Sequence, residues 1–112
     1  MSIRNIPTGE WPAFLDGVAR EHRAWLATVE RSGLVEAREE PLKSISADAG
    51  IDIRIGDRTL HVERPQTVRV EETAEGATQA LHIDDATGER LTLRFRVAVA
   101  PGALDGVAPA EL

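Results

Sequence analysis

Three histidines are the first candidates for chemistry in this chain, because imidazole is a common general base and metal ligand. His61 and His82 stand at polar positions of segments in which apolar and polar residues alternate. The alternation predicts Asp52 opposite His61, and Asp84 follows His82 by two residues. A carboxylate beside an imidazole could orient a general base. We favour an ordinary cross-strand polar pair, since neither a nucleophile nor a third metal ligand has a predictable place beside them.

Arginines are the second candidates, because a guanidinium group binds carboxylates and phosphates in a bidentate fork. Those at polar positions of the alternating segments are Arg54, Arg69, Arg90, Arg94 and Arg96. Four acids at such positions nearly balance them: Asp52, Glu63, Glu71 and Asp84. We therefore favour an ordinary solvated sheet face, and keep a site for an anion or an acidic partner as the alternative. The candidate interaction surface comprises Arg54, His61, Arg69, His82, Arg94 and Arg96.

Other site chemistries find no support in the residue types and their spacing. The chain has no cysteine, which excludes disulfides, thiolate metal sites and cysteine nucleophiles. The acidic clusters lack the spacing of a calcium loop, and the turn glycines do not form a phosphate-binding loop. No serine occupies a nucleophile elbow. We therefore predict no catalytic residues, no metal and no cofactor, and a protein that is not an enzyme.

The overall charge also narrows the classes of partner. A formal net charge of −6 argues against nucleic-acid binding and against electrostatic docking on an anionic membrane. The N-terminal residues lack the apolar stretch of a signal peptide, and no apolar run is long enough to span a bilayer. We expect one domain over residues 1–112 in the cytoplasm, with residues 98–112 as a tail that is either loosely docked or frayed. The oligomeric state is left open.

The elements that must position these side chains begin with a helix. Thr8 is a suitable cap, and apolar residues at helical spacing predict a helix from about residue 9 to about residue 23. The apolar stripe comprises Trp11, Phe14, Leu15 and Val18, and we expect it to lie on Ile53, Leu60, Val70, Leu81 and Leu93 of a sheet. His22 ends this stripe, which favours a packing or capping role.

Alternation of apolar and polar residues from 51 to 97 predicts strands with one buried face and one solvated face. Three turn segments, at residues 56–57, 74–77 and 85–89, centre three antiparallel hairpins. Their registers place apolar residues opposite apolar residues in the pairs Ile53–Leu60, Val70–Leu81 and Leu81–Leu93. On the polar face they predict the pairs Asp52–His61, Arg69–His82, His82–Thr92 and Asp84–Arg90. A slip of one residue would turn a whole strand over, so these registers are strongly specified.

The segment between the helix and residue 51 is less regular. Alternation predicts a strand near residues 25–29, a turn at residues 31–33 and a returning strand at residues 34–39. Pro41 interrupts the return, which predicts an edge strand or a bulged strand there. The fold class is therefore α+β, with one N-terminal helix packed on a curved antiparallel meander of six or seven strands.

Short motifs along nearly the whole chain resemble those of an uncharacterised family of small bacterial single-domain proteins. They are Ile6, Glu10-Trp11, Phe14-Leu15, His22, Trp25-Leu26, Ile45-Ser46-Ala47-Asp48, Pro65, Thr67-Val68-Arg69-Val70-Glu71, Glu75-Gly76-Ala77 and Leu93-Arg94-Phe95. The resemblance implies a stand-alone bacterial domain and assigns no functional residues.

The function we expect is a non-enzymatic binding or regulatory module. Its contact surface would be the open sheet face or an unpaired edge near Pro41, and a protein partner is the expected ligand. The alternative is a small-molecule carrier with an apolar pocket between helix and sheet, which requires an underfilled core. An enzyme that uses His61 or His82 with Asp52 or Asp84 ranks third.

Overall fold

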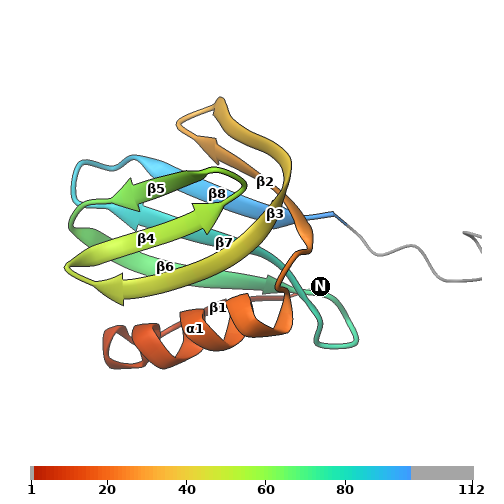
Figure 1. Cartoon of the computed structure of the whole chain (residues 1–112). Coiled ribbons are helices and arrows are strands. Elements are labelled where there is room, and N and C mark those ends of the chain that lie inside the picture. Colours follow the sequence, from red (N-terminus) through yellow and green to blue (C-terminus); the bar gives the residue numbers. More distant parts are fainter. Residues whose placement is uncertain (1, 97–112) are drawn as a thin grey trace, which may run out of the picture.

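The computed structural model describes residues 2–96, so the predicted tail at residues 98–112 lies outside the described residues. Its elements in chain order are β1 (Ser2–Asn5), the 3-10 turn η1 (Thr8–Glu10), α1 (Trp11–Glu21), β2 (Leu26–Arg31), β3 (Leu34–Asp48), β4 (Gly50–Ile55), β5 (Arg58–Val62), β6 (Pro65–Glu72), β7 (Thr78–Asp85) and β8 (Arg90–Phe95). One short helix packs on an antiparallel sheet (Figure 1), which confirms the α+β class.

The sheet has eight strands in the order β1-β6-β7-β8-β2-β3-β4-β5, so the expected six or seven strands were too few. The expected meander is also wrong, because β5 and β6 are not neighbours and β8 pairs with β2. The additional strand is β1, in a segment that the sequence indicated only as an extended lead. β1 pairs antiparallel with β6, and Ile3 lies opposite Glu71. Every side chain of β1 is exposed, so this strand lacks the alternation of buried and exposed positions that reveals a strand.

The three predicted hairpin registers are confirmed. β4 and β5 pair Ile53 with Leu60, and β7 pairs Leu81 with Val70 of β6 and with Leu93 of β8. The predicted polar pairs are present as well: Asp52–His61, Arg69–His82, His82–Thr92 and Asp84–Arg90. Burial of one face makes each register unique, because a slip by one residue would expose the apolar set.

The long strand β3 bends the sheet, because its first part pairs with β2 and its second part with β4. Register shifts mark β-bulges on both sides of Pro41, and Glu39 adopts a positive φ of 49°. A bulge adds local twist and bends a strand. Figure 1 shows β3 as a long curved ribbon that carries the chain from one half of the sheet to the other.

Pro41 was predicted on a strand that is bulged or lies at an edge, and the bulged strand is the correct alternative. The predicted unpaired edge near Pro41 is wrong, because β3 lies between β2 and β4. The carbonyl of Pro41 accepts a hydrogen bond from the Gly56 N–H at 2.9 Å, and the Leu42 N–H donates to the Trp25 carbonyl. The two edges of the sheet are β1 and β5.

The N-terminal helix forms where expected but is shorter, with α1 ending at Glu21 and η1 preceding it. Thr8 starts η1 and its side chain makes no capping hydrogen bond, so that expectation was wrong. The indole N–H of Trp11 donates instead to the Ile6 carbonyl at 2.8 Å, which ties the start of the helix to the segment after β1. No helix within residues 2–96 is long and apolar enough to cross a membrane.

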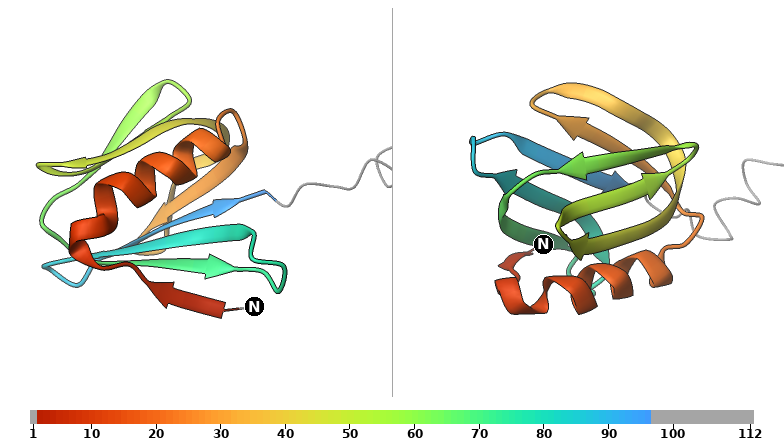
Figure 2. Two further views of the ribbon diagram at one scale, coloured as in Figure 1. Left: turned by 90° about the horizontal axis from the view of Figure 1, so that it is seen from below. Right: turned by 60° about the vertical axis from the view of Figure 1, so that its left-hand side comes forward.

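The core lies between the two halves of the bent sheet and the helix. Figure 2 shows α1 across the open side of the sheet, and its contacts are mainly with β3. Leu15 is fully buried in the same cluster as Ile53, Leu81 and Leu93, as the apolar stripe predicted. Phe14 and Leu60 of the predicted contact set are only partly buried and pack against this cluster.

The pairing of β4 with β5 brings Gly50 so close to the Val62 carbonyl that this position should reject a side chain. Gly50 has a φ of 114°, and a Cβ there would lie 2.7 Å from the Val62 carbonyl oxygen. We expect Gly50→Ala to lower the free energy of unfolding by at least about 1 kcal/mol. Gly17→Ala is the matched control, because Gly17 is helical with open space around it, and it should stabilise by roughly 0.5–1 kcal/mol. Urea denaturation measures both, and a neutral Gly50→Ala would contradict the close approach.

Candidate functional site

The predicted interaction residues divide between two outer surfaces of the bent sheet. Arg69, His82 and Arg94 lie on neighbouring strands β6, β7 and β8. Arg54 and His61 lie on β4 and β5, in the other half of the sheet (Figure 1). Arg96 follows β8 and forms an ion pair with Glu39 of β3 at 3.3 Å. The pairing of β6, β7 and β8 therefore brings three of the six candidates together, whereas Arg54 and His61 lie on the other half of the bent sheet and Arg96 turns to Glu39.

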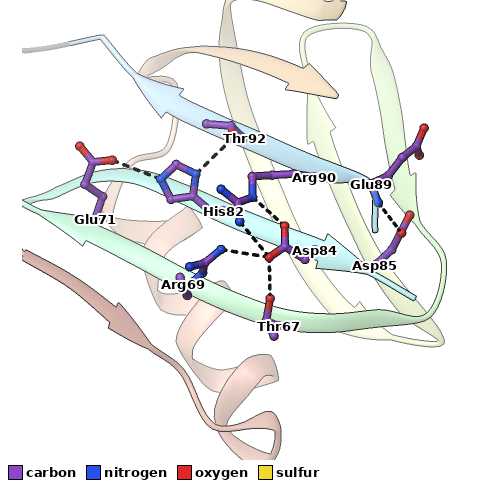
Figure 3. A network of polar contacts seen from close by, with 9 residues as sticks. All are labelled: Thr67, Arg69, Glu71, His82, Asp84, Asp85, Glu89, Arg90 and Thr92. Carbon is purple, nitrogen blue, oxygen red and sulfur yellow. Dashed lines mark hydrogen bonds and ion pairs between the residues drawn. The ribbon is translucent and has the colours of Figure 1, made fainter. Parts of the chain in front are cut away.

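The three gathered residues belong to a larger set, which we call the polar face. It comprises Arg69, Glu71, His82, Asp84, Arg90, Thr92 and Arg94, all directed outward from β6, β7 and β8. The alternation produces this set directly, because Val68, Val70, Leu81, Ile83, Leu91 and Leu93 of the same strands are buried. Figure 3 shows how these side chains, apart from Arg94, meet across the strands.

Asp84 is the first of two carboxylates that organise the polar face. It accepts hydrogen bonds from the Arg90 Nε at 2.7 Å and from the Arg90 Nη2 at 3.2 Å. Arg69 donates at 3.0 Å, and the Thr67 hydroxyl donates at 3.0 Å (Figure 3). The hydrogen bonds from Arg90 are the main reason that the pKa of Asp84 lies below its ordinary value, and Asp84 in turn raises the pKa of Arg90.

Glu71 is the second carboxylate and joins His82 to Arg94. The His82 Nε2 lies 3.2 Å from the Glu71 Oε1, and the two Arg94 Nη atoms each lie 3.4 Å from an oxygen of Glu71. The hydrogen bond from His82, followed by that from Arg94, lowers the pKa of Glu71 against the opposing effect of burial. Glu71 is therefore ionised at neutral pH although its side chain is nearly buried.

The Glu71–His82 contact also determines how His82 meets Thr92. An ionised carboxylate can only accept hydrogen bonds, so we assign the proton of the neutral imidazole to Nε2. Nδ1 then accepts from the Thr92 hydroxyl, whose oxygen lies at 3.2 Å. The result is a row of carboxylate, imidazole and hydroxyl across three strands (Figure 3). The predicted opposite pair Arg69–His82 forms no side-chain hydrogen bond, because Arg69 turns to Asp84.

Glu71, His82 and Thr92 resemble a general base with a hydroxyl nucleophile. The backbone N–H groups beside Thr92, however, are already hydrogen-bonded within the sheet. Thr92 lies in β8, which pairs with β7 on one side and β2 on the other. The strand N–H groups around Thr92 are thus committed to the sheet and not free to stabilise an oxyanion. Among residues 2–96, no group of three or more histidine, aspartate or glutamate side chains is arranged to hold a metal ion.

On the polar face the carboxylates lie deeper than the guanidinium groups. The Glu71 and Asp84 side chains are only 10% and 22% exposed, whereas those of Arg94 and Arg90 are 50% and 51% exposed. Both arginines line a shallow hollow of about 260 Å³, together with Thr28, Glu30, His82 and Thr92. A molecule that approaches this face therefore meets guanidinium groups first, while the carboxylates that hold them lie beneath.

The other two histidines have structural partners. The His61 Nδ1 lies 2.5 Å from an oxygen of Asp52, so the predicted cross-strand pair is confirmed. His22 is buried at the end of α1, where its Nδ1 donates to the Val18 carbonyl at 2.7 Å and its ring stacks on Phe95. This is the packing and capping role expected for it.

Sequence reasoning missed that His82 bonds to Glu71 and that Thr92 belongs to the site. In the observed register Ala80 lies between Arg94 on β8 and Glu71 on β6, and Arg94 donates a hydrogen bond to Glu71. Ala80 is small, so long side chains reach each other over it from β6 and β8. A small residue such as Ala80 between two charged residues was the feature of the sequence that could have predicted these contacts between β6 and β8.

Comparison with known protein families, with curated proteins and with solved structures finds no match to this chain. The geometry of the site therefore carries the functional argument alone.

The buried position of Glu71 leads to a test of its role. We expect Glu71→Gln to destabilise the protein by about 1–3 kcal/mol at pH 7, because His82 and Arg94 lose their charged acceptor. The folded pKa of Glu71 is lowered from 4.5, so its contribution exists above that value and is lost as pH falls through the folded pKa. The difference between the two proteins should therefore shrink in acid.

Denaturation measured at neutral and acidic pH tests this expectation. Glu63→Gln is the control, because Glu63 is exposed and the substitution removes the same charge. It should change stability little at either pH. A loss for Glu71→Gln that is constant from pH 7 to acid would contradict the role of the ionised carboxylate.

Proposed function

We propose that the protein is a non-enzymatic binding module that engages an acidic group of a partner through the polar face. The observation that carries this proposal is the exposed pair Arg90 and Arg94 at the hollow, each held from below by a carboxylate. Each guanidinium group uses two of its five N–H groups on Asp84 or Glu71, which orients it before a partner arrives. The remaining N–H groups can donate to a carboxylate of the partner. The partner class we infer is a protein surface rich in aspartate or glutamate.

The overall charge of −6 does not oppose this proposal at short range. At physiological ionic strength the Debye length is about 8 Å, so charges elsewhere on the surface are largely screened. At contact the local arrangement matters, in which Arg90 and Arg94 are about half exposed and outnumber the one exposed carboxylate of the hollow, Glu30. Thr28 and Thr92 add hydroxyl groups to the same hollow.

A binding role is favoured over catalysis because the face is rigid and its backbone is paired. β8 lies between two strands, and the contacts of His82 are with side chains of the sheet itself. The carrier alternative receives less support, since Leu15 on the sheet-facing side of α1 is fully buried among core side chains. We also propose that the protein acts in the bacterial cytoplasm and that it is related to the small bacterial family that its motifs resemble.

Substitution of the two exposed arginines tests the binding face. Titration of ¹⁵N-labelled protein with a short acetylated peptide of aspartate and glutamate should shift amide signals of β7 and β8. Because the carboxylates of the peptide need the guanidinium forks, the double variant Arg90→Ala/Arg94→Ala should lose these shifts. A peptide of asparagine and glutamine should cause none.

Arg54→Ala provides the matched control, because Arg54 is exposed on β4 in the other half of the sheet. The control should bind the acidic peptide as the wild type does, and added salt should weaken binding to both. Equal shifts in wild type and in the double variant would overturn the proposal.

A further inference from the structure

A second hollow, of about 270 Å³, lies at the opposite end of β8 from the β7–β8 loop. Its apolar lining includes Trp25, Ala77 and Phe95, and its polar lining includes Glu75, Gln79 and Arg96. It shares no lining residue with the hollow on the polar face. Any ligand bound here would therefore act independently of the acidic partner proposed above.

Trp25 is held in place although it is exposed. Its indole meets the His22 ring edge-on at 4.6 Å between centroids and the Phe95 ring at 6.1 Å. His22 stacks on Phe95 at 4.3 Å and is tied by its hydrogen bond to Val18. This aromatic cluster orients the indole before any ligand binds, which lowers the entropy cost of binding.

The two tryptophans of the chain are in contrasting environments. Trp11 is 7% exposed and its indole N–H is bonded to the Ile6 carbonyl. Trp25 is 40% exposed, and its indole N–H has no hydrogen-bond partner among residues 2–96. Trp25 thus offers an apolar ring and an available donor at the hollow.

The polar lining has a chemistry of its own. Glu75, Gln79 and Arg96 each end in a planar group with two neighbouring polar atoms, and Arg96 is steadied by Glu39 at 3.3 Å. Such a fork can hydrogen-bond two adjacent hydroxyl groups at once. Most of the surface that lines the hollow is apolar, so a ligand that fits it needs an apolar face as well as hydrogen-bonding groups.

We propose that this hollow binds a neutral carbohydrate ring. The C–H face of a pyranose packs on the exposed indole of Trp25, and its adjacent hydroxyl groups bond to the forked side chains of Glu75, Gln79 and Arg96. The volume of about 270 Å³ lies just below the usual range of sites for drug-sized ligands, which suits a ligand as small as one sugar ring.

The indole N–H signals of the full chain provide the test, because only Trp11 and Trp25 produce them. The probes are methyl glucosides, methyl galactosides, methyl mannosides, N-acetylglucosamine and cello- and malto-oligosaccharides at millimolar concentrations. We expect at least one sugar to move the Trp25 signal saturably while the Trp11 signal stays in place. Free indole serves as an apolar comparison ligand. The proposal is overturned if none of these sugars moves the Trp25 signal, or if free indole moves it and no sugar does.

Variants then connect the shift to the hollow. Trp25→Ala and Gln79→Ala should each weaken the binding of that sugar about tenfold, the loss typical of one stacking or forked contact. The Gln79→Ala result is decisive on its own if Trp25→Ala fails to fold. Leu34→Ala is the control, because Leu34 is 73% exposed at the β2–β3 turn, and it should bind normally. Unchanged affinity in Gln79→Ala overturns the proposal, whereas the acidic-peptide titration is unaffected by either result.

Discussion

The bend in β3 is the constraint on which the rest of the structure depends. An antiparallel sheet with one apolar face must cover that face, and a single helix of 11 residues cannot cover eight strands. The bulges on both sides of Pro41 solve this problem by folding the sheet over its own apolar face. α1 then needs to cover only the open side along β3, where Leu15 completes the core.

The same bend determines which charged residues are neighbours. It separates Arg54 and His61 from Arg69, His82 and Arg94, although all five stand at equivalent polar positions of alternating strands. Within one outer surface, pairing of β6, β7 and β8 places the carboxylates of Glu71 and Asp84 low, while Arg90 and Arg94 reach outward.

Much of the fold was predictable, because a strand with one buried face alternates apolar and polar residues along the sequence. The three hairpins were predicted with the correct partners, since their turns and their apolar residues independently specified one register. β1 shows no such pattern, because all its side chains are exposed and only its backbone pairs with β6. Pro41 was misleading in one respect, because a bulge lets a strand with proline keep partners on both sides.

For the site, the sequence by itself determined the rows of residues that face outward and the pairs directly across each hairpin. Asp52–His61 and Asp84–Arg90 follow from local turns and period-two alternation, which act over a few residues. Only the tertiary structure decided that Glu71 reaches His82 and that Arg96 meets Glu39. The tertiary structure also decided that Trp25 lies beside the β6–β7 loop. Those contacts depend on side-chain reach across small neighbours and on the bend of β3, and neither leaves a period in the sequence.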